Sequence, residues 1–177
     1  MPWPDGVGVE FVDVFTYLTG NSSTIDGGIR LADSGPFDIL AGATVHGGIS
    51  VEGHNLLGLF LCGSRIYGSV DLESLVDGIA LLGDPEEDLF DNGTCAGNTI
   101  QGSIALRNSN FILPFNGESN EIEGNTASGS VRVDHSTAEV YGNTIGGSLL
   151  CRFGSVIQPP GPVDPSTNTV HGANTCL

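Results

Sequence analysis

The sequence predicts an all-β fold, a single-stranded parallel β-helix (β-solenoid) of about seven turns with loop insertions. Three observations predict it: a short pattern that recurs seven times between Thr24 and Cys176, a glycine in every copy, and apolar residues at alternate positions after that glycine. Alternation with a period of two marks strands that bury one face. A helical repeat would show apolar residues at i, i+3 and i+4 with few glycines, whereas this chain has 27 glycines.

The copies are aligned on a first residue that is threonine in six of seven cases, at Thr24, Thr44, Arg65, Thr99, Thr126, Thr144 and Thr169. The fourth residue is glycine in all of them, which indicates a bend or a place with no room for a Cβ. The uneven spacing of the copies fits one solenoid turn each, with loops inserted in some turns. Equivalent strands should then stack about 4.8 Å apart in parallel sheets. Right-handed turns are expected because parallel crossovers usually have that hand.

An asparagine comes just before the first residue in four copies, at Asn98, Asn125, Asn143 and Asn168. Asparagine tolerates a left-handed backbone and can bond to the main chain of a neighbouring turn. Such a stack resembles the asparagine ladder of parallel β-helices, the fold of the pectate-lyase-like superfamily. The motif G-N-T-I-x-G-S also resembles repeat regions of secreted bacterial proteins, notably actinobacterial ones, whose function is largely unassigned. It resembles more weakly the bactofilins, which are polymer-forming β-helices.

Two pairs of cysteines stand at near-equivalent positions of consecutive copies. Cys151 and Cys176 each follow their leading threonine by seven residues, while Cys62 and Cys95 precede theirs by three and four. A vertical step of about 4.8 Å lies within the Cα separation of a disulfide. We therefore predict Cys62–Cys95 and Cys151–Cys176 among the three possible pairings, with four buried thiols as the alternative.

The chain is expected to form one elongated domain in three parts. Residues 1–23 form an N-terminal cap or a degenerate first turn, residues 24–168 the solenoid turns, and residues 169–177 a C-terminal half-turn closed by the second disulfide. Caps are expected because a terminal turn otherwise exposes core and unpaired backbone. The largest insertion, about residues 82–94, carries five carboxylates: Asp84, Glu86, Glu87, Asp88 and Asp91. They are weak candidates for a calcium site, because they lack the alternate spacing of a calcium loop, and a solvated loop is the alternative.

Side chains on the outer faces are the ones available for chemistry. Asp26 and His46 fall on adjacent turns, so the carboxylate could orient the imidazole, and Asp71 is a further weak catalytic candidate on the outer face. The alternative is an ordinary surface pair, because no nucleophile comes within reach of His46. No cofactor is expected.

The formal net charge is −16 and the chain has no lysine, which argues against nucleic-acid and anionic-membrane partners, since both attract clustered cations. No stretch is long enough to span a membrane, and the start of the chain is not a signal peptide. Disulfides favour an extracellular or cell-surface location. The expected function is therefore a non-catalytic structural or recognition protein, through self-association or a glycan or protein ligand on its surface. The alternative is a carbohydrate-active enzyme, a polysaccharide hydrolase or lyase, that uses loop carboxylates.

Overall fold

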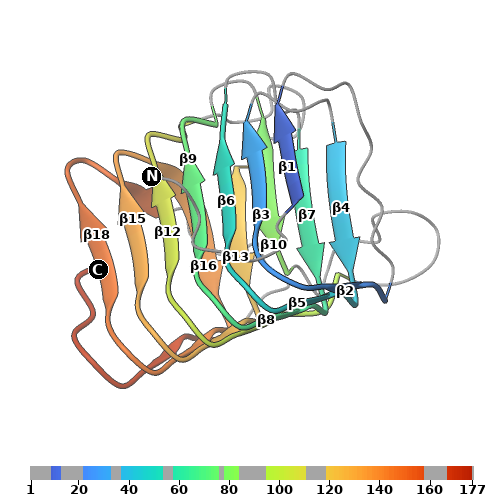
Figure 1. Ribbon diagram of the computed structural model, residues 1–177. Coiled ribbons are helices and arrows are strands. Elements are labelled where there is room, and N and C mark those ends of the chain that lie inside the picture. The colour runs from blue at the N-terminus through green and yellow to red at the C-terminus, as the bar shows by residue number, and fades with distance from the viewer. Residues whose placement is uncertain are drawn as a thin grey trace.

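The computed structural model describes residues 9–12, 22–32, 37–53, 58–75, 78–83, 95–110, 119–157 and 167–176. Within these ranges every regular element is a β-strand, and the strands form three parallel sheets (Figure 1). The described part of the chain is therefore an all-β structure of stacked parallel sheets, consistent with a parallel β-solenoid.

Sheets A and B contain the longer strands. Sheet A has seven strands in the order β1 (Val9–Val12), β3 (Ile29–Ala32), β6 (Ile49–Glu52), β9 (Val70–Glu73), β12 (Ile104–Arg107), β15 (Val131–Asp134) and β18 (Leu149–Arg152). Sheet B has six, in the order β4 (Phe37–Ala41), β7 (Gly58–Cys62), β10 (Ile79–Leu82), β13 (Asn120–Glu123), β16 (Thr137–Tyr141) and β19 (Val156–Ile157).

Sheet C is built from two-residue strands that begin at the leading residue of each sequence repeat. Its order is β2 (Thr24–Ile25), β5 (Thr44–Val45), β8 (Arg65–Ile66), β11 (Thr99–Ile100), β14 (Thr126–Ala127), β17 (Thr144–Ile145) and β20 (Thr169–Val170). The chain visits C, A and B in turn, and Figure 1 shows strands of A and B running in opposite directions on the two sides of the stack. One such passage is called a rung below.

The register of the sheets follows the columns of the sequence alignment. Thr99 pairs with Thr126 and Arg65, and Ile104 pairs with Val131 and Val70, so equivalent residues lie directly above one another. The first strand, β1, adds to the edge of sheet A by pairing Val9 with Ile29. The rest of the expected N-terminal cap, residues 1–8 and 13–21, lies outside the described residues.

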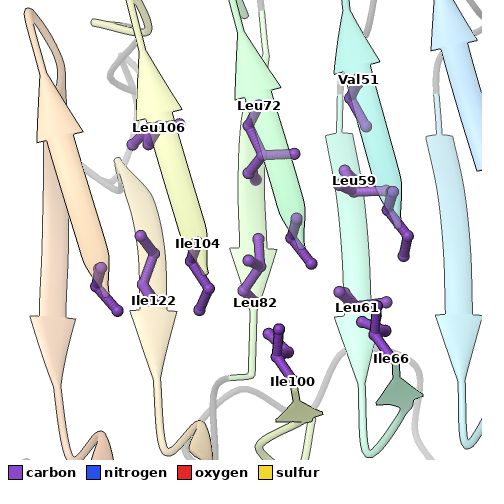
Figure 2. Close-up of a cluster of buried hydrophobic side chains, with 14 of the residues drawn as sticks. Val51, Leu59, Leu61, Ile66, Leu72, Leu82, Ile100, Ile104, Leu106 and Ile122 are labelled. Atoms are coloured by element: carbon purple, nitrogen blue, oxygen red, sulfur yellow. The ribbon is translucent and has the colours of Figure 1, made fainter. Parts of the chain in front are cut away.

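The core lies between the sheets and consists of the inward column of each strand. Figure 2 shows Val51, Leu72 and Leu106 of sheet A and Leu59, Leu82 and Ile122 of sheet B directed into the space between the two layers, with Ile66 and Ile100 of sheet C closing it. All of these side chains are buried. Burial of a leucine or isoleucine contributes about 1.5–3 kcal/mol, so this column supplies the main stabilisation of the stack.

The glycine of each repeat lies where consecutive rungs come closest. A Cβ added to Gly68 would lie 2.5 Å from the backbone nitrogen of Gly48, and one added to Gly102 would lie 2.6 Å from the carbonyl oxygen of Gly68. Atoms cannot approach so closely, and because backbone atoms are among the obstacles, moving a side chain would not relieve the clash. From Gly47 to Gly172 the glycine column therefore reflects lack of space between the rungs, whereas Gly27 has a φ of +102°.

Buried asparagines hold the corner between sheets B and C. The Oδ1 atom of Asn125 accepts hydrogen bonds from the backbone N–H and the Nδ2 of Asn98, both at 2.9 Å. Asn143 does the same for Asn125, and Asn168 for Asn143. Each asparagine also donates its Nδ2 to a sheet B carbonyl of the preceding rung, as Asn125 does to Leu82 at 2.6 Å. The side chain of each asparagine thus completes the buried hydrogen bonding of the rung before it.

A second ladder, made of serines, follows the glycine column. The backbone N–H of Ser103 donates to the hydroxyl of Ser69, and the same bond links Ser130 to Ser103 and Ser148 to Ser130, at 3.0–3.1 Å. Here the later rung donates to a side chain of the earlier one.

Both pairs of cysteines form disulfides between adjacent rungs. Cys62 is bonded to Cys95 with Cα atoms 4.8 Å apart, and Cys151 to Cys176 with Cα atoms 4.9 Å apart. The separation equals the distance between stacked strands, as the register expects. The second bridge fastens residues 174–176 onto the edge of sheet A, where Asn174 pairs with Leu149.

Candidate functional site

Asp26 and His46 meet on the outer side of sheet C. The short bends after β2 and β5 carry them on adjacent rungs, and Asp26 Oδ1 lies 2.8 Å from His46 Nδ1. The ring of Tyr67, one rung further, meets the His46 ring edge-to-face with centroids 5.2 Å apart. All three side chains are exposed, and that of Asp26 is 83% accessible. The carboxylate can fix the orientation of the imidazole, but the group is open to water on its outer side.

Asp71 belongs to a different surface, the outer face of sheet A. It accepts hydrogen bonds from Nη2 of Arg107 at 2.5 and 2.6 Å, and Glu73 lies 3.5 Å from the same nitrogen. Burial acts to lower the pKa of Arg107, but the hydrogen bond and charge of Asp71, with the charges of Glu73 and Asp134, outweigh it and raise that pKa. Arg107 is therefore a fixed cation, and Asp71 is engaged in an ion pair rather than grouped with His46.

A further ion pair on sheet A joins Arg132 to Asp134. The Asp134 side chain is 6% accessible, so this pair is shielded from water better than the others. Arg107, Arg132 and Asp134 were not singled out by the sequence as site residues. Their only signal was that they occupy outward positions of the strand columns on neighbouring rungs, as the register confirms.

The five loop carboxylates Asp84, Glu86, Glu87, Asp88 and Asp91 lie outside the described residues. Among the residues that are described, no group of three or more histidine, cysteine, aspartate or glutamate side chains is arranged to hold a metal ion. The same part of the chain contains no helix long and apolar enough to cross a membrane.

A cavity of about 480 Å³ lies at the C-terminal end of the stack. Core residues Val140, Leu149 and Ile157 form its apolar wall, and Arg152 and Asn168 add polar groups. Sheet B ends beside it in the two-residue strand β19. No residue type in the sequence pointed to this cavity.

Two aromatic rings stack beside this end. His135 and Phe153 are parallel within 3° with centroids 5.1 Å apart, and both have a positive φ, +46° and +53°. A positive φ is uncommon for a bulky residue such as phenylalanine. Phe153 is 65% exposed, so it presents an aromatic surface at the edge where sheet A strands end.

The described surface therefore offers three separate features: the Asp26–His46–Tyr67 group on sheet C, the ion pairs on sheet A, and the open C-terminal end. Of the three catalytic candidates, Asp26 and His46 are brought together, whereas Asp71 lies on sheet A. Comparison of the chain with protein-family models, with curated proteins and with solved structures found no match, so its resemblance to known proteins rests on the repeat pattern and the stacked parallel sheets.

Proposed function

We propose that the protein is a non-catalytic structural or recognition β-solenoid that acts outside the cell, in adhesion, surface binding or an extracellular assembly. We place it, by its repeat pattern, among right-handed parallel β-helices similar to the secreted bacterial proteins with G-N-T-I-x-G-S repeats. Two disulfides are compatible with an oxidising, extracellular location.

The observation that supports this proposal is the use of the buried polar groups. Asn98, Asn125 and Asn143 are 1% exposed, and their side chains bond to neighbouring rungs. Catalytic groups are usually placed in concave, partly water-excluded sites where their pKa values are shifted. Here the buried asparagines join one rung to the next, which produces a stiff body with long, regular outer faces.

The outer faces are suited to recognition because they are held by the register rather than by mobile loops. Asp26, His46 and Tyr67 stand on successive rungs of sheet C, so a ligand that lies along the stack would meet a fixed series of polar and aromatic groups. Rigid presentation reduces the entropy lost on binding.

The test is incubation with a panel of polysaccharides, with both binding and cleavage measured. We expect binding or no interaction, and no new reducing ends or unsaturated sugars. Cleavage would overturn the proposal and favour the enzyme alternative. The variant Glu86→Gln would then distinguish an activity of the acidic loop from a contaminating enzyme, with Glu52→Gln, an exposed carboxylate on sheet A, as the control.

A further inference from the structure

The charges of this chain are unevenly distributed over its faces. Four of its five arginines stand on the outer face of sheet A: Arg30, Arg107, Arg132 and Arg152. The described acidic side chains of the same face are also four: Glu52, Asp71, Glu73 and Asp134. By the register, the position of Glu10 in β1 is also on this face, next to that of Arg30. With 5 Lys+Arg and 21 Asp+Glu in all, one arginine and 16 acidic residues are left for the rest of the chain, which is 15 of the 16 units of net negative charge. The sheet A face is thus nearly balanced in an otherwise strongly acidic protein.

The two signs are separated along the face. The strands toward the N-terminal end, β3, β6 and β9, carry Arg30 and three carboxylates, whereas β12, β15 and β18 carry three arginines and Asp134. Of the five strands centred on β12, β6 and β9 on one side carry three carboxylates, whereas β15 and β18 on the other carry two arginines and Asp134, and Arg107 stands on β12 itself. The formal charges of the two sides are therefore −3 and +1. Figure 1 shows the strands of both halves side by side as one continuous layer.

Part of this charge is neutralised within the chain. Arg107 bridges the boundary between the halves by bonding Asp71 and lying 3.5 Å from Glu73, and Arg132 is paired with Asp134. Glu52 and Arg152 are exposed and belong to no ion pair among the described residues. They stand on β6 and β18, four strand positions apart, or about 19 Å at a strand spacing of about 4.8 Å.

From this self-complementary arrangement we propose that the outer face of sheet A binds the same face of a second copy of this chain, related by a twofold axis that runs along β12. The inference deepens the proposed function by naming one partner for the assembly. In such an isologous contact each residue i that meets j is matched by j meeting i.

The geometry follows from the register. A twofold axis parallel to the strands in the plane of contact reverses the order of the strands but keeps their direction. It therefore places Glu52 opposite the second copy's Arg152, and Asp71 opposite its Arg132. Because the axis is twofold, each of these two contacts occurs twice in the dimer. Ala105 and Arg107 of β12 each meet their own copy on the axis, where the small side chain of Ala105 permits close approach. The meeting of the two Arg107 side chains is a like-charge contact, and each of them already lies beside Asp71 and Glu73 of its own chain. Glu73 comes opposite Asp134, and each of these carboxylates already lies beside an arginine of its own chain.

A second copy is a better occupant than an acidic or a basic ligand. An acidic polymer would meet the carboxylates on one side of β12, and a basic one the arginines on the other, whereas a second copy with its strands in reversed order brings arginines to carboxylates on both sides. Like charges elsewhere on two copies of net charge −16 repel, so the nearly balanced face is where contact costs least. The face is small, about 20 Å by 13 Å for five strands of four residues, so the dimer is weak and concentration-dependent.

Sedimentation equilibrium in about 0.15 M salt, up to about 1 mM protein, tests this contact. The wild-type chain should dimerise, and Glu52→Arg and Arg152→Glu should each lower the association constant by about tenfold or more, because each creates two like-charge contacts. The double variant Glu52→Arg/Arg152→Glu keeps the net charge of the wild type and should recover association to within about threefold. Asp26→Arg changes the net charge as Glu52→Arg does but lies on sheet C, and it should not weaken the dimer.

Circular dichroism of each variant checks that it is folded, since both exchanged side chains are exposed. A wild-type chain that stays monomeric at about 1 mM, single variants that associate like the wild type, or a folded double variant that does not recover would each overturn the inference. None of these results bears on glycan binding or cleavage, so this failure is distinguishable from failure of the proposed function.

Discussion

Asn125 is the residue at which the importance of the asparagine ladder can be measured most directly. Its Oδ1 accepts the backbone N–H of Asn98, which has no other acceptor among the described hydrogen bonds, and its Nδ2 donates to Leu82 and to Asn143. The variant Asn125→Ala removes these bonds and leaves the buried Asn98 N–H without a partner. We expect this orphaned donor to dominate the loss of stability.

The expected loss of stability is the sum of two contributions, one from the donor left without an acceptor and one from the other hydrogen bonds that are lost. An orphaned buried donor costs about 2 kcal/mol, and the other lost hydrogen bonds add about 1 kcal/mol, so Asn125→Ala should lower the free energy of unfolding by about 3 kcal/mol. For a chain of this length that corresponds to a fall in Tm of about 6–12 °C.

Serine at the same position provides a graded comparison. Ser64 already occupies this ladder one rung before Asn98, where its hydroxyl accepts the N–H of Ala43 and donates to the carbonyl of Leu40, both at 3.1 Å. Asn125→Ser should therefore retain an acceptor for the Asn98 N–H and cost only about 1 kcal/mol. Ser128→Ala, an exposed site on the same rung, should change stability by less than about 0.5 kcal/mol.

Denaturant unfolding gives the free energies, and hydrogen exchange of the Asn98 amide reports the particular bond. Exchange of that amide should be faster in Asn125→Ala than in Asn125→Ser, beyond what the difference in global stability explains. Equal stability of the alanine and serine variants, or wild-type stability of the alanine variant, would refute the reasoning, because the ladder would then contribute nothing through its acceptor.

Three further perturbations test other parts of the stack. Gly102→Ala would set a Cβ 2.6 Å from the backbone of the rung below and should cost about 2–3 kcal/mol by thermal unfolding, whereas its exposed neighbour Gln101→Ala should cost almost nothing. Replacing Cys151 and Cys176 by serine removes a disulfide of sequence separation 25 and should lower the free energy of unfolding by about 3.5 kcal/mol, the loop-closure entropy of a loop of that length. If the stack frays from its end, faster hydrogen exchange should be confined to the last rung. Arg107→Gln should lower the free energy of unfolding in urea by only about 1 kcal/mol at low salt, because the ion pairs of Arg107 are partly exposed, and by less in 1 M salt. A larger loss that does not depend on salt would show that packing rather than charge matters at Arg107.

Much of the fold could be read from the sequence because every rung repeats one pattern. The alternation after each glycine identified inward residues such as Ile104 and Leu106, and both are fully buried. The cysteine pairing could be argued from equivalent positions because stacked strands are separated by the Cα distance of a disulfide. These features depend on local spacing, which one sequence is sufficient to show.

The surface was less predictable because it depends on which rotamers long side chains adopt across rungs. The sequence placed Asp71 on the outer face as a weak catalytic candidate, but it did not show that the hydrogen bonds of Asp71 go to Arg107 on the next strand of sheet A. The serine ladder was not predicted, because glycine and alanine occupy the same column in other copies of the repeat. The C-terminal cavity is lined by residues of β16, β18 and β19 and by the segment 174–176, and no residue type in the sequence signals that these meet around a hollow.

The direction of the asparagine bonds has a consequence for biosynthesis. The N–H of Asn98 has its acceptor only when Asn125 is in place, and the N–H of Asn125 likewise requires Asn143. During synthesis on the ribosome, the most recently made rung would therefore lack this hydrogen bond until the next asparagine of the ladder had emerged. The hydrogen bonding of each rung should thus be completed one repeat after the rung itself is translated.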